Sequence, residues 1–283
     1  MVQKKNLPKV LVAGITGNQG GTVAKQLKQA GFHVIGLTRN INKSKSVKLI
    51  ESGFELREGD LNQPETLNKI TSEIDFAFLI TDFWAGKSNE IKHGINFINA
   101  FKSCKHIIFS STPTSIWNNT FAHSDSKFEI EMYLKNHATN YSIIRPGFYM
   151  EIFQQFSFCP PMILGMMKKN IGTNLKLPFV SIEDIGKAVC TILKSPNDYQ
   201  KKEINIFGDY LSLAEVLVIF KAIKGRNPWS FSIPNWLFKK LVSTDLVAMW
   251  QWFGKNKFAI DKRELSNEHI SFNDWLQNKK VLI

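Results

Sequence analysis

The chain has 283 residues, an apolar share of 43% and a formal net charge of +12 at pH 7, values that suit a globular protein with a sizeable core. The positive excess is spread evenly, because residues 1–150 and residues 151–283 each carry 18 Lys and Arg against 12 Asp and Glu. Proteins that read DNA usually concentrate their positive charge on a patch or a reading element, so this spread argues against direct nucleic-acid binding and favours small anionic ligands.

The composition also bears on location and metals. The first ten residues hold no long apolar segment, and the longest apolar run, residues 158–167, is short and contains Pro160 and Pro161. We therefore expect no signal peptide, no membrane span and a cytoplasmic location. The three cysteines are odd in number and far apart, and the six histidines are scattered, so we expect reduced cysteines and no metal site.

The first predicted strand leads into a glycine-rich turn. Residues 10–13 form an apolar run, Gly14, Gly17 and Gly20 follow at three-residue spacing, and a helical pattern extends to about Ala30. Glycines allow close backbone approach, and the free N–H groups at a helix start attract a pyrophosphate. The spacing is GxxGxxG rather than the commoner GxGxxG. We interpret it as a nucleotide site, with a purely structural turn as the alternative.

Strands and helices then alternate along the first half of the chain. Further strands are predicted at residues 33–38, 54–57, 75–81, 107–111 and 141–145. Helices are predicted up to residue 52, at 64–72, at 87–103 and at 124–136. This alternation predicts right-handed crossovers and an α/β fold, a Rossmann-like doubly wound parallel sheet, with the glycine turn at its ligand-binding edge.

The alternation stops after Gly147. Residues 181–184 resemble a capping box that opens a helix to about residue 193, and residues 203–207 form one more predicted strand. From Ser212 the pattern is helical and rich in aromatic residues, most of which we expect to be core. We predict a cofactor-binding domain over residues 1–150 and a smaller, mostly helical C-terminal lobe over residues 151–283, which contributes elements back to the sheet.

Arg39 follows the second predicted strand, where NAD-specific sites place an acid that accepts from the ribose 2′-hydroxyl. Lys43 lies four residues on. Cations at this point would pair with a 2′-phosphate, so the sequence favours NADP(H) over NAD(H). The alternative is that Arg39 is an exposed arginine at a helix start.

Two further strand ends carry candidate cofactor contacts. Asp60 and Leu61 follow the third strand, where the acid would meet the adenine amine and the leucine would flank the ring; alternatively, Asp60 is a helix N-terminal acid. Thr81, Asp82 and Phe83 follow the fourth strand and would border the middle of the cofactor. The aromatic residue there could instead fill a packing gap.

Lys127 is the main candidate for chemistry in the HSDSKFEIEMYL segment, four residues after His123. Conventional short-chain dehydrogenases place a Tyr four residues before an active-site Lys that holds the nicotinamide ribose. Position 123 is His, so the phenolic acid is missing. Lys127 could still hold the ribose, or it could be a solvated helix lysine.

An ordered set of segments resembles the NmrA-like family of atypical short-chain dehydrogenase relatives. The segments are GITGNQGG, Thr38-Arg39-Asn40, GDLNQPETL, ITDFW, EIKHG, HSDSKFEIEMYL, IRPGFYME, SIEDIGKAV and SFNDWL. The resemblance covers nearly the whole chain and implies an NADP-binding Rossmann domain. It implies a pyrophosphate site lined by Gly14, Thr16, Gly17, Asn18, Gln19 and Gly20.

The resemblance assigns the remaining cofactor contacts as well. Arg39 and Lys43 would take the 2′-phosphate, and Lys92 and Lys127 would lie near the nicotinamide half. We expect the site to extend to Phe148, which follows the sixth predicted strand.

Two functions are compatible with these features. The first is an NADP(H)-binding regulator, a redox or dinucleotide sensor with weak or no turnover whose helical lobe engages another protein. The second is an NADPH-dependent reductase of a small apolar carbonyl, quinone or enone, with a pocket between residues 148–158 and the lobe and with Lys127 or water as proton donor. The missing Tyr favours the regulator.

Overall fold

The computed structural model describes residues 7–117, 120–154, 159–256, 258, 260 and 268–279. These form two compact units, each built from several chain segments. The first unit comprises residues 1–116, 125–145 and 185–204, and the second comprises residues 117–124, 146–184 and 205–283. The chain therefore passes between the units several times.

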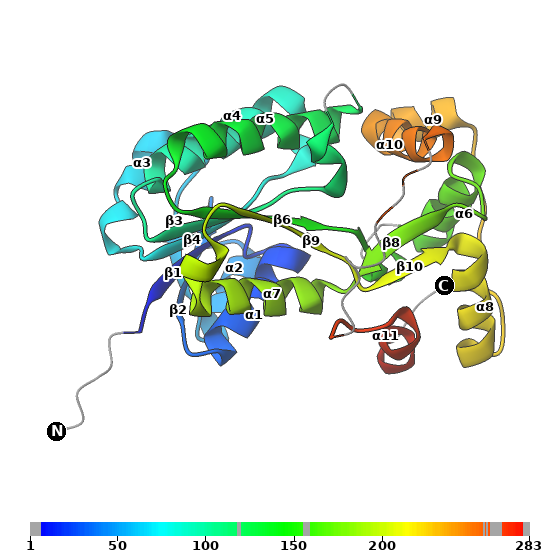
Figure 1. Cartoon of the computed structure of the whole chain (residues 1–283), viewed down its shortest axis with the longest axis horizontal. Coiled ribbons are helices and arrows are strands. Elements are labelled where there is room, and N and C mark those ends of the chain that lie inside the picture. Colours follow the sequence, from blue (N-terminus) through cyan, green and yellow to red (C-terminus); the bar gives the residue numbers. More distant parts are fainter. Residues whose placement is uncertain are drawn as a thin grey trace. The chain divides into compact units, whose positions relative to one another are not determined.

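The first unit is built on a seven-stranded sheet (Figure 1) with the order β3-β2-β1-β4-β5-β6-β9. Its strands are β1 Lys9–Ala13, β2 His33–Thr38, β3 Glu55–Glu58, β4 Phe76–Ile80, β5 His106–Ser110, β6 Tyr141–Pro146 and β9 Lys202–Ile206. The pairings from β3 through β6 are parallel. The strand order reverses between β1 and β4, which is the point where doubly wound sheets bind ligands.

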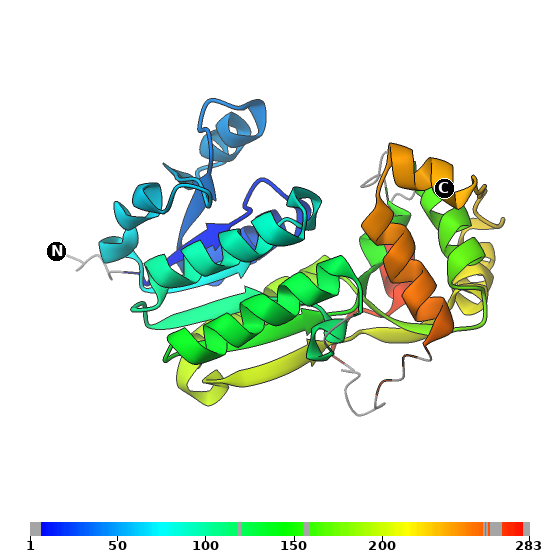
Figure 2. The ribbon, with the colours of Figure 1, turned by 90° about the horizontal axis from the view of Figure 1, so that it is seen from above.

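Helices cover both faces of this sheet. They are α1 Asn18–Gln29, α2 Ser44–Glu51, α3 Pro64–Asn68, α4 Lys87–Phe101, α5 Ala122–His137 and α7 Ile182–Lys194. Helices α3, α4 and α5 lie on one face and α1, α2 and α7 on the other (Figure 1), and Figure 2 shows α4 and α5 side by side. Short 3-10 helices occur at Thr71–Glu73, Phe83–Ala85, Pro113–Ile116, Met150–Phe153 and Pro196–Tyr199. The doubly wound fold predicted from the alternating pattern is confirmed.

The second unit contains a three-stranded sheet that the sequence did not predict. Its order is β10-β8-β7, with β7 Phe148–Tyr149, β8 Lys176–Val180 and β10 Asp209–Ser212. Strand β8 pairs with β10 in the antiparallel sense across about thirty residues of chain, a long-range pairing that local periodicity does not reveal. The C-terminal lobe is therefore a small α/β unit, richer in helix than in strand.

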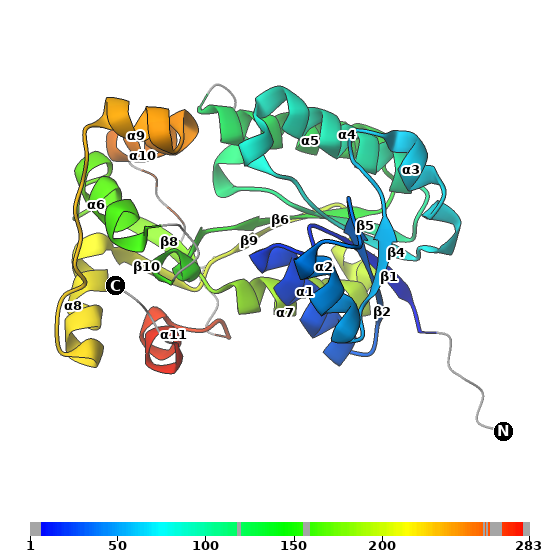
Figure 3. The same ribbon diagram turned by 180° about the vertical axis from the view of Figure 1, so that it is seen from behind.

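Several helices accompany this sheet in the described residues (Figure 3). They are α6 Pro160–Asn170, α8 Leu213–Lys224, α9 Asn235–Leu241, α10 Thr244–Lys255 and α11 Phe272–Asn278. Helix α8 begins with a complete capping box, in which the Ser212 hydroxyl accepts from the Glu215 amide and the Glu215 carboxylate accepts from the Ser212 amide. None of the helices in the described part of the chain is long and apolar enough to cross a membrane.

Aromatic side chains dominate the core of the second unit. Phe238, Trp250 and Trp275 are buried in it, whereas Trp229 and Trp236 are exposed. Core packing thus accounts for several of the aromatic residues of the lobe, as the sequence predicted.

A buried carboxylate forms hydrogen bonds with several chain segments of the second unit. Glu151 accepts hydrogen bonds from the Ile182 amide, the Ser181 hydroxyl and the Trp275 indole. Burial raises the pKa of the Glu151 carboxyl even though these bonds act against the rise. Glu151, in the 3-10 helix Met150–Phe153, therefore holds Ser181, Ile182 and helix α11 of the second unit through one polar group.

Candidate functional site

A close backbone approach shapes the turn between β1 and α1. Gly14 has a φ of +72°, and its carbonyl accepts from the Gly17 amide at 2.9 Å. A Cβ atom at position 20 would lie 2.3 Å from the Gly14 carbonyl oxygen, so only glycine fits there without moving the turn. Helix α1 consequently starts directly against the end of β1, with its first amides open to the same side.

A cleft of about 790 Å³ opens at this turn, at the carboxyl ends of the central strands. It lies wholly within the first unit. Twelve of the predicted cofactor residues line it, namely Gly14, Thr16, Gly17, Asn18, Gln19, Gly20, Arg39, Lys43, Asp60, Leu61, Thr81 and Asp82. The structure thus brings together residues from four strand ends that lie up to about seventy positions apart.

One wall of the cleft is basic. Arg39 and Lys43 line it together with Lys45, and the β2 strand that leads into this wall ends at Thr38 rather than at an acid. Ser44 and Lys45 also belong to the wall and were missed by the sequence reasoning, although they directly follow Lys43. This wall suits an anionic group such as a phosphate monoester.

Carboxylates that follow β3 and β4 also line the cleft. Asp60 accepts from the Asn62 amide at 2.9 Å, and Asp82 accepts from the Trp84 amide at 3.1 Å. These bonds hold the two loops in shape while both residues still line the cleft. Their negative charges disfavour a phosphate close to them and suit hydrogen-bond donors.

Gln19 links the glycine turn to the middle of the sheet. Its side-chain amide donates to the Ser110 hydroxyl at 2.7 Å, and the residue is almost fully buried. The sequence placed Gln19 among the pyrophosphate contacts; the residue lines the cleft, and its side-chain amide nitrogen also holds the end of β5.

Lys127 lies in a buried polar network behind the cleft wall. Its ammonium is 3.1 Å from a Glu90 carboxylate oxygen and donates to the Thr81 hydroxyl at 2.5 Å. Ser126 donates to the second oxygen of Glu90, and the Lys127 ammonium lies 5.3 Å from the centre of the Phe109 ring. Because Thr81 lines the cleft, the network reaches the wall through that hydroxyl. Lys127 itself is buried, not a solvated helix lysine.

Four other predicted residues are not among those that line the cleft, namely Phe83, Lys92, His123 and Phe148. Lys92 is exposed on α4, and the Phe83 ring packs against Trp84 in a tilted arrangement with ring centres 4.5 Å apart. Phe148 and His123 belong to the second unit, where Phe148 contacts Phe253 at 5.0 Å between ring centres. Residues 155–158 of the predicted substrate pocket lie outside the described residues.

His93 is a lining residue that the sequence reasoning passed over in favour of its neighbour Lys92. Helix geometry contains the missing signal. Glu90 and Phe97 are buried on α4, and the residue three positions after Glu90 lies on the same side of the helix. That residue is His93, so the EIKHG segment reaches the cleft through its histidine.

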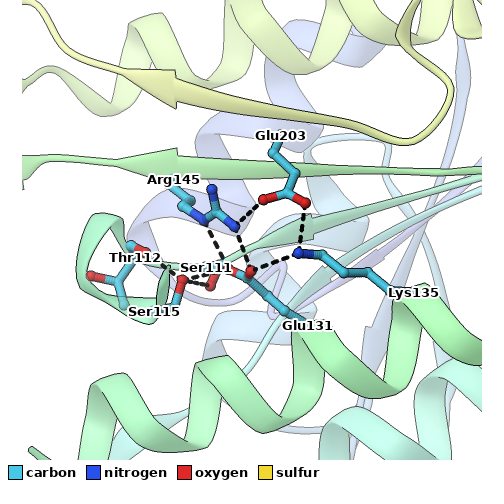
Figure 4. Close-up of polar contacts among 7 residues, drawn as sticks. All are labelled: Ser111, Thr112, Ser115, Glu131, Lys135, Arg145 and Glu203. Carbon is cyan, nitrogen blue, oxygen red and sulfur yellow. Dashed lines mark hydrogen bonds and ion pairs between the residues drawn. The ribbon is translucent and has the colours of Figure 1, made fainter. Parts of the chain in front are cut away.

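A second charged cluster lies between α5, β6 and β9 (Figure 4). Arg145 binds both oxygens of Glu131, at 3.0 and 2.6 Å, and also donates to Glu203, which pairs with Lys135 at 2.6 Å. Although burial alone would raise the pKa of Glu203, its bonds to Lys135 and Arg145 hold that pKa below the usual range. Ser115 donates to Glu131 at 2.5 Å and ties the cluster to the loop after β5. We read this cluster as structural.

Comparison with known proteins agrees with this architecture. The model of the NmrA-like family matches residues 6–276. An NmrA-like family domain-containing protein of Dictyostelium discoideum is 26% identical over 294 residues, covering 95% of this chain and 97% of that protein.

Solved structures of two proteins show the same fold with different assigned roles. NmrA, a negative transcriptional regulator in complex with NADP, is 20% identical with a TM-score of 0.77 and covers 97% of this chain and 95% of that one; a complex of NmrA with NAD is similar to the same degree. The triphenylmethane reductase of Citrobacter sp., complexed with NADP(H), is 18% identical with a TM-score of 0.76 and covers 95% of this chain and 98% of that one. With a family match over nearly its full length and the predicted doubly wound sheet in place, the chain belongs to the NmrA-like family.

Proposed function

We propose that the chain binds NADP(H) in the cleft between β1, β2 and β4. The observation that carries this proposal is the glycine turn: at Gly20 a side chain would meet the backbone of Gly14 at 2.3 Å, beside an open helix start in a cleft of about 790 Å³. A dinucleotide needs such a place for its pyrophosphate. The relatives described above that bind NAD or NADP(H) support the same assignment.

We propose NADP(H) rather than NAD(H) as the preferred cofactor. Arg39 directly follows β2, where an acid would serve the ribose 2′-hydroxyl of NAD, and Lys43 and Lys45 line the same cleft. Three cations on one wall would pair with a 2′-phosphate through charge-assisted hydrogen bonds. The pyrophosphate would rest on the residues of the glycine turn, and the cofactor would supply hydride chemistry if the protein has turnover.

The role that we favour is a cytoplasmic dinucleotide sensor that regulates another protein. Two features support it. Position 123 is His where a phenolic acid would be needed, and the Lys127 ammonium is paired with the buried Glu90 carboxylate. A lysine committed in this way positions Thr81 and is a poor proton donor to a substrate.

The second candidate is an NADPH-dependent reductase of a small apolar carbonyl, quinone or enone. The aromatic contacts around Phe148 in the second unit, with Phe253 and Phe179 at 5.0 and 6.1 Å, would suit an apolar substrate. The similarity to triphenylmethane reductase also favours this alternative.

Calorimetry and an activity assay separate the outcomes. We expect NADPH to bind more tightly than NADH, and equal affinities would overturn the preference for NADP(H). We expect no substrate-dependent loss of NADPH absorbance with quinones, enones and aldehydes. Oxidation at ordinary enzymatic rates, lost in Lys127→Ala while NADPH still binds, would establish the reductase instead.

A further inference from the structure

A buried polar atom in the cleft has no hydrogen-bond partner among the residues that the structure describes. The Nε2 atom of His93 is buried and makes no hydrogen bond, although His93 lines the cleft. A buried donor or acceptor without a partner costs about 1–3 kcal/mol, so native proteins rarely keep one without a reason. A ligand that fills the cleft would provide the missing partner.

The position of His93 is set by bonds on both sides of it along α4. One turn earlier, Glu90 accepts from the Thr81 hydroxyl at 2.8 Å, after β4. One turn later, the Asn96 amide donates to the Leu61 carbonyl at 2.7 Å, after β3. These two contacts hold the helix against both loops, and His93 lies between them.

The surroundings of His93 select a neutral group over a phosphate. Burial lowers the pKa of the His93 imidazole; the negative charges of Asp60 and Asp82 act against this, and the positive charges of Arg39 and Lys92 act with it. The ring is therefore neutral at pH 7, with one donor and one acceptor nitrogen. The same two carboxylates would repel a phosphate, whereas Leu61, which lines the cleft beside Asp60, would tolerate a planar apolar ring.

We propose that His93 recognises the adenine base of the bound dinucleotide through its Nε2 atom. This inference rests on the proposed NADP(H) site and assigns the base within it. The phosphates of the same ligand already have places, because the glycine turn suits the pyrophosphate and the basic wall suits the 2′-phosphate. The base is the remaining part of that half that offers neutral donors and acceptors to Nε2.

Calorimetry with parts of the cofactor tests this assignment. The ligands are NADPH, NADH, adenosine 2′,5′-bisphosphate and reduced nicotinamide mononucleotide. We expect His93→Leu to weaken the first three by about tenfold each, because one hydrogen bond to the shared adenine is lost. Binding of the mononucleotide, which has no adenine, should be unchanged. An equal loss for NADPH and NADH distinguishes a base contact from a phosphate contact.

Two controls make the result decisive. Lys102→Ala changes an exposed lysine at the end of the same helix, outside the cleft, and should bind all ligands like the wild type. His93→Gln keeps a side-chain amide that can hydrogen-bond, so it should recover part of the affinity and keeps the test usable if His93→Leu folds poorly. The affinity for NADPH relative to its hypoxanthine analogue should also be higher in the wild type than in His93→Leu.

The possible failures are distinct. If the wild type binds neither dinucleotide, the proposed function is wrong and this inference falls with it. If the wild type binds NADPH but His93→Leu and His93→Gln bind adenosine 2′,5′-bisphosphate as tightly as the wild type, only the role of His93 is wrong, and water satisfies the imidazole in the bound state.

Discussion

The glycines of the β1–α1 turn differ in how much space they have, although they look equivalent in the sequence. A Cβ atom at position 20 would lie 2.3 Å from the Gly14 carbonyl oxygen, whereas one at position 17 would lie 3.3 Å from the same atom. The first distance requires the backbone to move, and the second requires a shift of only a few tenths of an ångström. The turn therefore depends mainly on Gly20.

We predict that Gly20→Ala weakens NADPH binding by about a hundredfold or more, because the displaced turn no longer presents its amides. Gly17→Ala should stay within about tenfold of the wild type. Calorimetry with both variants checks the order, after circular dichroism has shown that they fold. Normal NADPH binding by a folded Gly20→Ala would mean that the turn is only structural.

Arg39 decides the choice between the two dinucleotides at the residue scale. Arg39→Glu should weaken NADPH binding by about ten- to a hundredfold, the value of one charge-assisted contact, and leave NADH binding unchanged or improved. Lys48→Glu makes the same charge change at an exposed position of α2 outside the cleft and serves as the control. A similar loss in both variants would point to the general field of the protein rather than to a contact.

The Lys127–Glu90 pair allows a stability test of the buried network. Lys127→Met should lower the free energy of unfolding by about 3–5 kcal/mol, because it leaves a buried carboxylate without its cation. The double variant Lys127→Met/Glu90→Gln should lose clearly less than the two single variants together. Urea unfolding of the four proteins checks the coupling, and strict additivity would contradict the pairing.

At the scale of elements, a backbone segment of the second unit packs tightly on α6. The Phe231 amide donates to the Pro161 carbonyl, and a Cβ atom at position 165 would lie 1.8 Å from the Phe231 carbonyl oxygen. Lys168 adds a hydrogen bond to the Ser230 hydroxyl at 2.8 Å. Gly165, in the middle of α6, therefore permits this close contact because it has no side chain.

Replacing Gly165 by alanine should destabilise the protein, although the same replacement usually stabilises a helix. Gly→Ala in a helix interior ordinarily stabilises by about 0.5–1 kcal/mol. We expect Gly165→Ala to destabilise by about 1–3 kcal/mol, since the segment must move. Gly186→Ala in α7 is the matched control, because its nearest neighbour is the flexible Gln26 side chain at 3.0 Å. Thermal unfolding of both variants compares the signs, and a stabilised Gly165→Ala would contradict the close packing.

At the scale of the whole molecule, a buried histidine makes stability depend on pH. Burial lowers the pKa of His106 from the ordinary 6.5 to about 4, and its Nε2 atom lies 2.7 Å from the Ser142 hydroxyl oxygen. Between these two pKa values the unfolded chain binds a proton that the folded chain does not. The contribution of His106 is thus complete above pH 6.5 and is lost as the pH falls toward 4.

We predict that this histidine accounts for about 3 kcal/mol of the fall in stability between pH 6.5 and 4. Urea unfolding at several pH values should give a flatter profile for His106→Gln than for the wild type. His137→Gln, which removes an exposed imidazole, should keep the wild-type slope. Subtracting the stability profile of His106→Gln from that of the wild type also cancels the contribution of Glu151. The raised pKa of Glu151 changes stability with pH in the opposite direction.

The sequence alone predicted the doubly wound sheet and half of the residues that line the candidate cofactor cleft. The sheet and the strand-end residues follow from local signals, since apolar runs bounded by turns mark the strands and residues at strand ends must meet at one edge of a parallel sheet. The family resemblance supplied the other residues of the glycine turn. Gly20 and Arg39, which follow neighbouring strands, are therefore predicted at the same edge from their positions in the chain. The small sheet of the second unit had no such signal, because its strands pair across long stretches of chain.

Only the tertiary structure decided the surroundings of individual side chains. The sequence left open whether Lys127 is a solvated or a ribose-binding lysine. Folding buries it against Glu90, thirty-seven residues away. Lys92 and His93 are neighbours in the sequence, yet one is exposed and the other lines the cleft with an unpaired nitrogen. Pairing and burial depend on which distant elements pack together, and local sequence patterns do not encode those contacts.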